Sequence, residues 1–190
     1  ANGKVVKACV TRVEDEMIVE TIKGVAKLNL NSQSELNYSS IEEIETDVLI
    51  VGGGPSGMSA AGEISKFNLD VILIDDKDKF GGKLVLQTHK FFGSVDDCYA
   101  GTRGIDIADK LYTDLLKYPS LKLWNEAVCF GVFSDKKIGV IRNGICYFIK
   151  PKAVVFATGA REKTLLFEGN TLPGVYGAGA FQTLVNRDLV

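Results

Sequence analysis

Three glycines in the spacing Gly52-x-Gly54-x-x-Gly57 are the residues whose types and positions most directly indicate chemistry. Between a strand and a helix, this spacing holds the diphosphate of a dinucleotide on N–H groups at the positive end of the helix. The first glycine permits a tight turn, the second lets the diphosphate approach the backbone, and the third allows the helix to pack closely. We therefore predict a dinucleotide site at this turn.

The flanking residues supply the strand and the helix that such a turn requires. The run Val48–Val51 is typical of a buried strand, and the pattern from Pro55 to about Phe67 is helical. Pro55 falls in the first turn, where a missing N–H has little effect. Strand, turn and helix therefore follow in the order that a nucleotide site needs.

A second apolar run ends in a carboxylate at the spacing expected of a ribose ligand. Residues 70–75 predict another buried parallel strand, and Asp75 follows Gly52 by 23 positions. An acid at about this distance binds ribose hydroxyls in dinucleotide-binding folds. We expect Asp75 to make that contact in preference to Asp76, because Asp75 ends the apolar run directly.

Composition narrows the class of protein. With 190 residues, 46% of them hydrophobic, the chain can bury one good core. A formal net charge of −2 gives no reason to expect nucleic acid or an anionic membrane as a partner. No apolar run reaches the roughly 20 residues of a spanning helix, and no signal segment is apparent, so we expect a cytoplasmic protein. The four cysteines form no closely spaced pair, which argues against a zinc site or a redox dithiol within the chain.

The chain is predicted to contain three segments. Residues 1–30 alternate loosely, with short strands expected at 4–10 and 17–22 around a charged turn at 14–16. Residues 31–45 are rich in Asn, Ser and Glu and are interpreted as a linker. Residues 46–190 are predicted to form the nucleotide-binding domain.

Within that domain the later elements follow from periodicity and turn residues. A helix is expected at 103–118, and an antiparallel meander is expected from strands at 121–124, 127–133, 138–142 and 145–149. Asn143-Gly144 is a hairpin signal. A further buried strand is expected at 153–159, and a helix is expected to begin near Ala180.

Four pieces in order give the chain a family resemblance: the glycine-rich strand–helix–strand unit, an acid followed by Phe80-Gly-Gly82, the meander, and Ala157-Thr-Gly159. Together they resemble flavoprotein oxidoreductases of the pyridine-nucleotide-disulfide-reductase-like type, which have two dinucleotide folds. The resemblance implies an α/β fold with a Rossmann-like FAD-binding unit, a parallel sheet and an antiparallel β-meander. It also implies FAD as cofactor.

The resemblance assigns cofactor-binding residues. The ADP half of FAD would lie on Gly52, Gly54, Pro55, Ser56, Gly57 and Asp75, with Asp76 beside them, while Gly81, Gly82 and Lys83 would lie near the diphosphate and ribityl chain. Val128 would offer backbone groups to adenine, and Ala157, Thr158 and Gly159 would mark the crossover beside the cofactor.

A closer resemblance is to the large subunits of bacterial amine and amino-acid dehydrogenases of the sarcosine oxidase alpha, dye-linked proline dehydrogenase and hydrogen cyanide synthase type. The segments 75–84, 157–162 and 172–176 are similar to that group. Residues 2–21 are similar to the end of a plant-type, ferredoxin-like [2Fe-2S] module, in which Cys9 would be the last ligand. In the complete protein, electrons would then leave the flavin through an iron–sulfur cluster.

The departures from the family pattern lead us to expect a fragment. Such a cluster needs four thiolates, so the other three are expected upstream of Ala1. The NAD(P)-binding unit and the last strand of the FAD site are expected beyond Val190. No cysteine accompanies Gly81-Gly82, which disfavours disulfide reduction.

Three functions stay open on the sequence: an FAD-dependent amine or amino-acid dehydrogenase, an NAD(P)H-dependent flavoprotein reductase, and a non-enzymatic remnant. The single histidine, His89, has no visible partner, so no catalytic residue is assigned. Association with a partner subunit or with a second copy is expected, because missing strands would leave apolar surface exposed.

Overall fold

The structure, a computed structural model, describes residues 13, 15–20 and 41–188. The chain divides into two units at residues 37 and 38. In the first unit the expected turn is present at Asp15 and Glu16, but residues 17–20 do not form the expected strand. Ile18 and Val19 are 68% and 70% exposed, so alternation here does not produce one buried face. The other predicted strand and Cys9 lie outside the described residues.

The described part of the second unit contains one six-stranded mixed sheet in the order β3-β2-β1-β6-β5-β4. The strands are β1 (Ile41–Val51), β2 (Val71–Ile74), β3 (Leu121–Trp124), β4 (Ala127–Val132), β5 (Ile138–Arg142) and β6 (Ile145–Phe156). The helices are α1 (Pro55–Ser65), η2 (Gly82–Leu86), α2 (Val95–Cys98), α3 (Gly104–Leu115), α4 (Ala178–Thr183) and the π-helical turn η3 (Leu184–Asp188). Among these helices none is long and apolar enough to cross a membrane.

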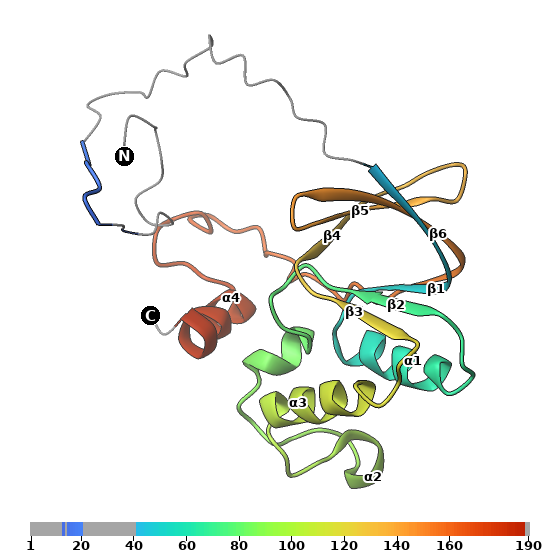
Figure 1. Ribbon diagram of the computed structural model, residues 1–190. Helices are drawn as coiled ribbons and strands as arrows, with labels where there is room; N and C mark the ends of the chain where they lie inside the picture. Colours follow the sequence, from blue (N-terminus) through green and yellow to red (C-terminus); the bar gives the residue numbers. More distant parts are fainter. Residues whose placement is uncertain (1–12, 14, 21–40, 189–190) are drawn as a thin grey trace. The chain divides into compact units, whose positions relative to one another are not determined.

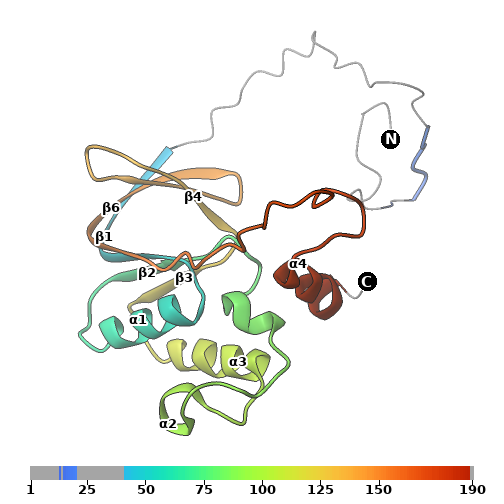
Figure 2. The same cartoon turned by 180° about the vertical axis from the view of Figure 1, so that it is seen from behind.

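Strands β3, β2, β1 and β6 run parallel, and β6, β5 and β4 form antiparallel pairs. Helices α1 and α3 cover one face of the parallel strands, and the β4–β5 arm covers the other (Figures 1 and 2). This arrangement confirms the predicted α/β class, with a Rossmann-like unit and a meander.

Side-chain alternation along β1 and β2 builds two cores, one on each face of the sheet. Val48 and Ile50 of β1 contribute to the helix-side cluster with Met58 and Ala61 of α1. Their neighbours contribute to the cluster under the meander, whose buried members are Leu49, Val51, Ile72, Ile74, Ala127, Ile138, Val140 and Ile149. Because both faces are covered, the central strands are apolar at consecutive positions, as buried parallel strands usually are.

Strand β3 corrects one expectation. The sequence placed residues 121–124 in the antiparallel meander, but β3 pairs parallel with β2, from Val71 opposite Leu121 to Ile74 opposite Trp124. The segment between β2 and β3 crosses the helix face, and such a crossover returns the chain parallel to the strand that it left. Leu121 is accordingly buried in the helix-side cluster.

A second correction concerns β6, which joins the two strands predicted at 145–149 and 153–159 into one. Pro151 lies between them and pairs with Thr46 of β1. The pairing of β6 with β5 ends at Ile149, so among the described residues no strand lies on that side of Pro151. Proline is tolerated at such an edge because it has no N–H to donate.

Two local expectations are confirmed. Asn143 and Gly144 have φ angles of 51° and 77°, as the two-residue turn between β5 and β6 requires. Pro55 occupies the first turn of α1. After the other end of this helix, Asn68 has a φ of 56°, which asparagine tolerates. In contrast, β1 begins at Ile41, so residues 41–45 belong to the sheet although the sequence placed them in the linker.

Asp47 connects three neighbouring segments at the end of the sheet opposite the glycine turn. Its carboxylate accepts a hydrogen bond from the N–H of Asp70 at 2.9 Å and pairs with Lys152 Nζ at 2.6 Å. The hydrogen bond from Lys152, followed by that from Asp70, lowers the pKa of Asp47 against the opposing effect of desolvation. Asp47 thus joins β1 to β6 and to the residue that precedes β2.

The contacts of the Asp47 carboxylate predict an acid-sensitive contribution to the free energy of unfolding. Because the folded pKa of Asp47 lies below the unfolded value of about 3.9, the contribution is fully present above that value and is lost as pH falls through the folded pKa. We expect Asp47→Asn to destabilise the protein in urea at pH 7 and to match the wild type more closely at pH 3. If Asp47→Asn lost the same free energy of unfolding at pH 7 and at pH 3, the acid-sensitive role of Asp47 would be contradicted.

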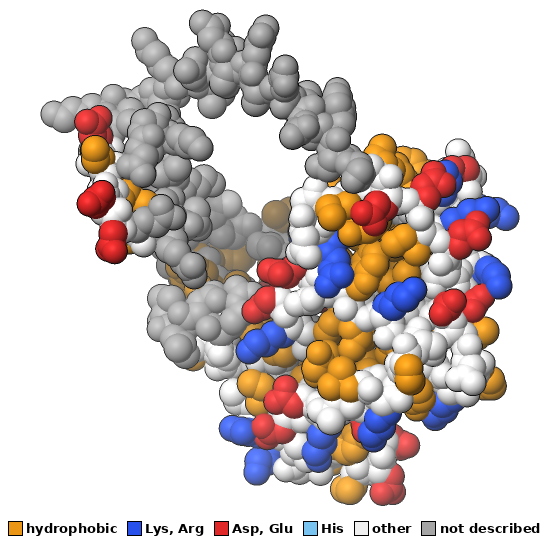
Figure 3. All heavy atoms as spheres, viewed as in Figure 1, with side chains coloured by type: hydrophobic (Ala, Val, Ile, Leu, Met, Phe, Trp, Pro, Cys, Tyr) orange, Lys and Arg blue, Asp and Glu red, His pale blue; other side chains and the backbone are white. Residues whose placement is uncertain are grey.

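Hydrophobic side chains also gather on the face of the second unit that Figure 3 shows. On the meander, Val128, Phe130, Val132 and Ile141 are between 46% and 61% exposed. Phe130, Phe133 and Phe148 form edge-to-face ring contacts there. The meander therefore buries one face and presents an apolar surface on the other.

Candidate functional site: the glycine turn at the strand ends

The glycine turn lies at the carboxyl end of β1, between the ends of β2 and β6. Gly52 has a φ of +110°, and a Cβ there would lie 2.3 Å from the carbonyl oxygen of Ala157. The N–H of Ala157 in turn donates to the carbonyl of Val51 at 2.8 Å. The sheet order diverges here, with β2 on one side of β1 and β6 on the other. Such a point is where ligands bind in open α/β sheets.

Gly57 is required by packing. A Cβ on Gly57 would lie 1.8 Å from the carbonyl oxygen of Gly52, closer than any real contact. Gly53 is restricted in the same way, since a Cβ there would lie 2.2 Å from the ring of Phe80. Sequence reasoning missed the roles of Gly53 and Phe80, and the uninterrupted triple glycine was the available signal.

Gly54 differs from its neighbours because packing does not explain it. The nearest atom to a Cβ at Gly54 would be the Cα of Gly82, at an ordinary 3.9 Å. A Cβ on Gly82 would in contrast lie 2.9 Å from the Cα of Gly54. The double-glycine loop is held there by a 2.8 Å hydrogen bond from the N–H of Gly81 to the carbonyl of Gly53. Two bare backbone segments therefore face each other at the start of α1.

The first turn of α1 fits a phosphate group. Gly54 is the N-cap and supplies no side-chain cap, and the first turn contains no acidic residue. Pro55 has no N–H, which leaves the N–H groups of Ser56 and Gly57 in the first turn, where a helix has no internal acceptors for them. With no side chain in the way at Gly54, these donors can receive an anion.

Asp75, at the end of β2, faces the glycine turn. One carboxylate oxygen accepts from the N–H of Gly53 at 2.6 Å and the other from the N–H of Lys77 at 2.9 Å. The side chain is buried, and each oxygen keeps a lone pair for a further donor. Asp76 in contrast is exposed and forms an ion pair with Lys77. The geometry therefore places Asp75, and not Asp76, beside the turn.

We predict that Asp75→Ala lowers the free energy of unfolding by about 2–3 kcal/mol, because the buried N–H of Gly53 loses a charged acceptor. Asp76→Ala is the matched control, and loss of its exposed ion pair should change stability by less than about 1 kcal/mol. Urea denaturation of both variants measures the difference. Equal effects would show that the Asp75 carboxylate does not hold the turn.

The remaining expected cofactor residues lie at the margins of this site. Val128 is half exposed and follows Ala127, whose N–H donates to the carbonyl of Asp75 at 2.8 Å. Thr158 and Gly159 are exposed just beyond the end of β6. Lys83 lies in η2, exposed, with no hydrogen bond or ion pair to another described residue. The structure therefore brings the glycines, Asp75 and Ala157 together and leaves Lys83 and Val128 at the rim.

No catalytic group emerges from the described residues. His89 is exposed and stacks on Phe92, with ring centroids 4.7 Å apart, and accepts from the N–H of Phe91. Partial burial raises the pKa of the Cys129 thiol, which disfavours the reactive thiolate. Residues 13, 15–20 and 41–188 hold no cluster of metal-ligating side chains.

The sheet order, the glycine turn and the acid that ends β2 define a dinucleotide-binding domain of the flavoprotein oxidoreductase class. Residues 46–187 match the family described as pyridine nucleotide-disulphide oxidoreductase. The chain therefore belongs to the pyridine nucleotide-disulphide oxidoreductase family. It is an FAD-binding portion of such an oxidoreductase, which confirms the resemblance drawn from the motifs.

The chain is similar to several known proteins. It is 29% identical to the alpha subunit of sarcosine oxidase from Corynebacterium sp. (strain U-96), across 98% of this chain and 20% of the relative. It is 32% identical to one subunit of opine oxidase from Agrobacterium tumefaciens (strain Ach5), across 72% of this chain and 28% of the relative. The crystal structure of L-proline dehydrogenase from P. horikoshii superposes with a TM-score of 0.68 at 32% identity, covering 78% of this chain and 29% of that one. The chain thus spans less than a third of each relative.

Proposed function

We propose that the complete protein oxidises an amino acid that carries a secondary amine, and that this chain binds the FAD. The observation that carries the proposal is a chemical feature shared by the compounds after which three of the similar proteins are named. Sarcosine, opines and L-proline each combine a secondary amine with a neighbouring carboxylate. Bound FAD supplies the acceptor for a hydride from the carbon next to such a nitrogen.

The residues of this chain hold and orient the cofactor. The N–H groups of Ser56 and Gly57 would hold the diphosphate, and the bare backbone of Gly54 would let it approach. Asp75 would accept from the ribose hydroxyls, while the hydrogen bond from Gly53 keeps its carboxylate in place. The strand order β2-β1-β6 supports this assignment, because it brings Asp75, the glycine turn and Ala157 to the same end of the sheet.

Further assignments belong to the same proposal. In the complete protein, Cys9 would contribute the last ligand of a [2Fe-2S] cluster, and a second dinucleotide fold would bind NAD(P). The sarcosine oxidase and opine oxidase relatives are subunits, which supports a partner subunit for this chain. The exposed apolar face of the meander supports association as well, since exposed patches of this kind mark interaction sites. The cytoplasmic location stays a prediction from the sequence.

Anaerobic reduction of the FAD-loaded full-length protein tests the proposed reaction. Sarcosine, L-proline and an opine are mixed with it separately, with glycine as the primary-amine control and NADH as a competing reductant. We expect at least one secondary amine to bleach the flavin absorption faster than glycine or NADH does. Bleaching by NADH alone would overturn the proposal in favour of a flavoprotein reductase.

A further inference from the structure

Residues 80–86 form the side of the candidate site that faces the start of α1, although they belong to no strand of the sheet. Gly82 is the residue of this segment that lies against Gly54, since a Cβ on Gly82 would be 2.9 Å from the Cα of Gly54. The width of the opening in front of the first turn of α1 therefore depends on where this segment lies.

Phe80 lies between the glycine turn and α3. On one side, its ring fills the space that a Cβ on Gly53 would need. On the other side, it stacks on the ring of Tyr112, with centroids 5.9 Å apart and planes at 16°. Phe80 is 9% exposed and Tyr112 is 38% exposed. The two rings thus connect the surface of α3 to the glycine turn.

The next residue, Gly81, is held from the same two sides. Its N–H donates to the carbonyl of Gly53 at 2.8 Å, and a Cβ on Gly81 would lie 2.8 Å from the Cβ of Ala108 in α3. Ala108 and Tyr112 are four positions apart, so they share one face of α3. This face packs the beginning of the segment against the glycine turn.

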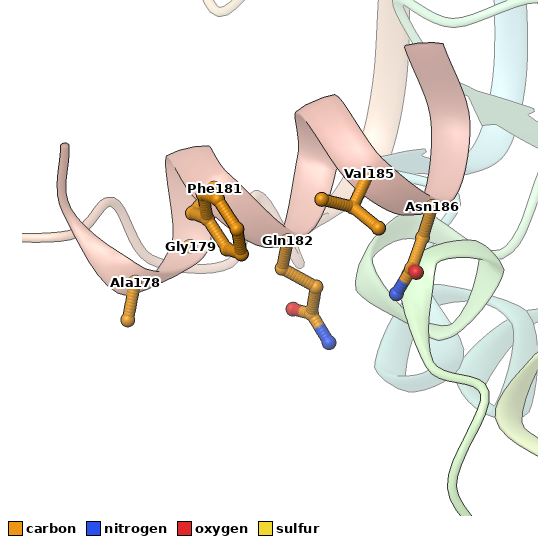
Figure 4. A pocket seen from close by; sticks show the side chains of 6 residues that line it. All are labelled: Ala178, Gly179, Phe181, Gln182, Val185 and Asn186. Atoms are coloured by element: carbon orange, nitrogen blue, oxygen red, sulfur yellow. The ribbon is translucent and has the colours of Figure 1, made fainter. Parts of the chain in front are cut away.

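The other end of the segment is fixed separately. Leu86 ends η2, and its carbonyl accepts from Nδ2 of Asn186 at 2.7 Å. Asn186 extends from the helical segment formed by α4 and η3 (Figure 4). The start of that helical segment is held by a 3.0 Å hydrogen bond from the N–H of Gly179 to a carboxylate oxygen of Glu162. The contacts of Phe80 therefore bear on the beginning of residues 80–86 and not on their end.

We propose that Phe80 and Tyr112 are positioning residues, which set the gap between Gly54 and Gly82 and thereby the affinity of the site for the diphosphate of FAD. The inference rests on the placement of FAD given under the proposed function. Binding groups stay close to their productive positions when packed side chains behind them restrict their movement. The stacked rings act in this way on the backbone of the double-glycine loop, without touching the cofactor themselves.

Calorimetric titration of the full-length protein with FAD tests the role of Phe80, with Leu121→Val as the control for Phe80→Leu. Phe80 and Leu121 belong to the same core cluster and are both 9% exposed, but Leu121 lies opposite Val71, at the end of β2 away from Asp75. Phe80→Leu should weaken FAD binding about tenfold, the equivalent of one charge-assisted hydrogen bond, and Leu121→Val should not weaken it. Equal FAD affinities in the two variants would overturn the inference.

Substitutions at Tyr112 provide a test that does not depend on a buried position. Tyr112→Leu removes one of the two stacked rings and should weaken FAD binding about threefold, whereas Tyr112→Phe keeps the ring and should bind FAD as the wild type does. Equal FAD affinities in the two variants would contradict a role for the stacked ring.

Hydrogen exchange without FAD separates the possible failures. Tyr112→Leu should speed exchange of the Gly81 N–H relative to Tyr112→Phe, because the loop that carries this hydrogen bond is less restricted. Exchange at the same rate in both variants would show that the rings do not position the loop. If the wild type binds no FAD, the proposed function fails and this inference fails with it. If the wild type binds FAD and the Phe80 and Tyr112 variants bind it equally well, only this inference fails.

Discussion

Replacing Gly57 with alanine is expected to lower the free energy of unfolding by more than about 3 kcal/mol and to leave little folded protein. The added Cβ would meet the carbonyl oxygen of Gly52 at 1.8 Å, and neither backbone can rotate away as a side chain could. Overpacking between side chains already costs about 1–3 kcal/mol. Moving α1 aside would also withdraw Met58 and Ala61 from the helix-side core. Against a typical stability of about 5–15 kcal/mol, the loss is large.

Gly62, on the same helix, provides the matched control. A Cβ there would lie 3.5 Å from a methyl group of Leu115, an ordinary contact. Because glycine is a poor residue inside a helix, Gly62→Ala should stabilise the protein by about 0.5–1 kcal/mol. Urea denaturation of both variants measures the contrast. If Gly57→Ala unfolded at the wild-type midpoint, the close contact between α1 and the turn would be wrong.

Gly54→Ala is expected to have the opposite effect from Gly57→Ala: the protein stays folded but its affinity for FAD falls. The nearest neighbour of the new Cβ would be the Cα of Gly82 at 3.9 Å, so stability should change by less than about 1 kcal/mol. The methyl group would occupy the approach to the N–H groups of the first turn. Loss of two charge-assisted hydrogen bonds, at about 1.5 kcal/mol or more each, corresponds to at least about 100-fold weaker FAD binding.

Calorimetric titration of the full-length protein with FAD checks this second prediction, with Gly62→Ala again as the control. Unchanged FAD affinity in a folded Gly54→Ala protein would show that the cofactor does not approach the turn at this position. The two glycine substitutions thus separate the parts of the motif, since Gly57 acts through packing and Gly54 through access to the backbone.

The sequence predicted well those features that depend on neighbouring residues. The apolar run at 48–51, the proline that opens α1 and the acid after β2 are local patterns, and each appears in the structure at its expected place. The hairpin at Asn143 is of the same kind, because its turn geometry is set by two residues. The order of strand, turn, helix and strand around the site could therefore be predicted from the sequence alone.

Features that depend on strand partners could not be derived in this way. The residues of β3 predict a strand, but they do not predict its partner. The pairing with β2 depends on the crossover over the helix face. In β6, Pro151 suggests a break, and only the absence of a described β5 partner at that position explains why the strand continues. Each depends on pairing between residues that are distant in sequence.

The site shows the same division. The spacing of the glycines identified the turn, but the restriction on Gly53 comes from Phe80, which lies on a loop after the next strand. The bonds from Gly179 to Glu162 and from Asn186 to Leu86 join segments that no local motif relates. Contacts between segments that are distant in sequence are therefore those that sequence reasoning missed.

Hydrogen–deuterium exchange of the full-length protein, with and without FAD, tests the central claim most directly. The N–H groups of Ser56 and Gly57 lie in the first turn of α1, where no helix carbonyl protects them. FAD is expected to slow exchange there and at Gly82, with little change along β5. Spectroscopically verified FAD binding that left the exchange of the first turn unchanged would contradict the assignment of the diphosphate to this site.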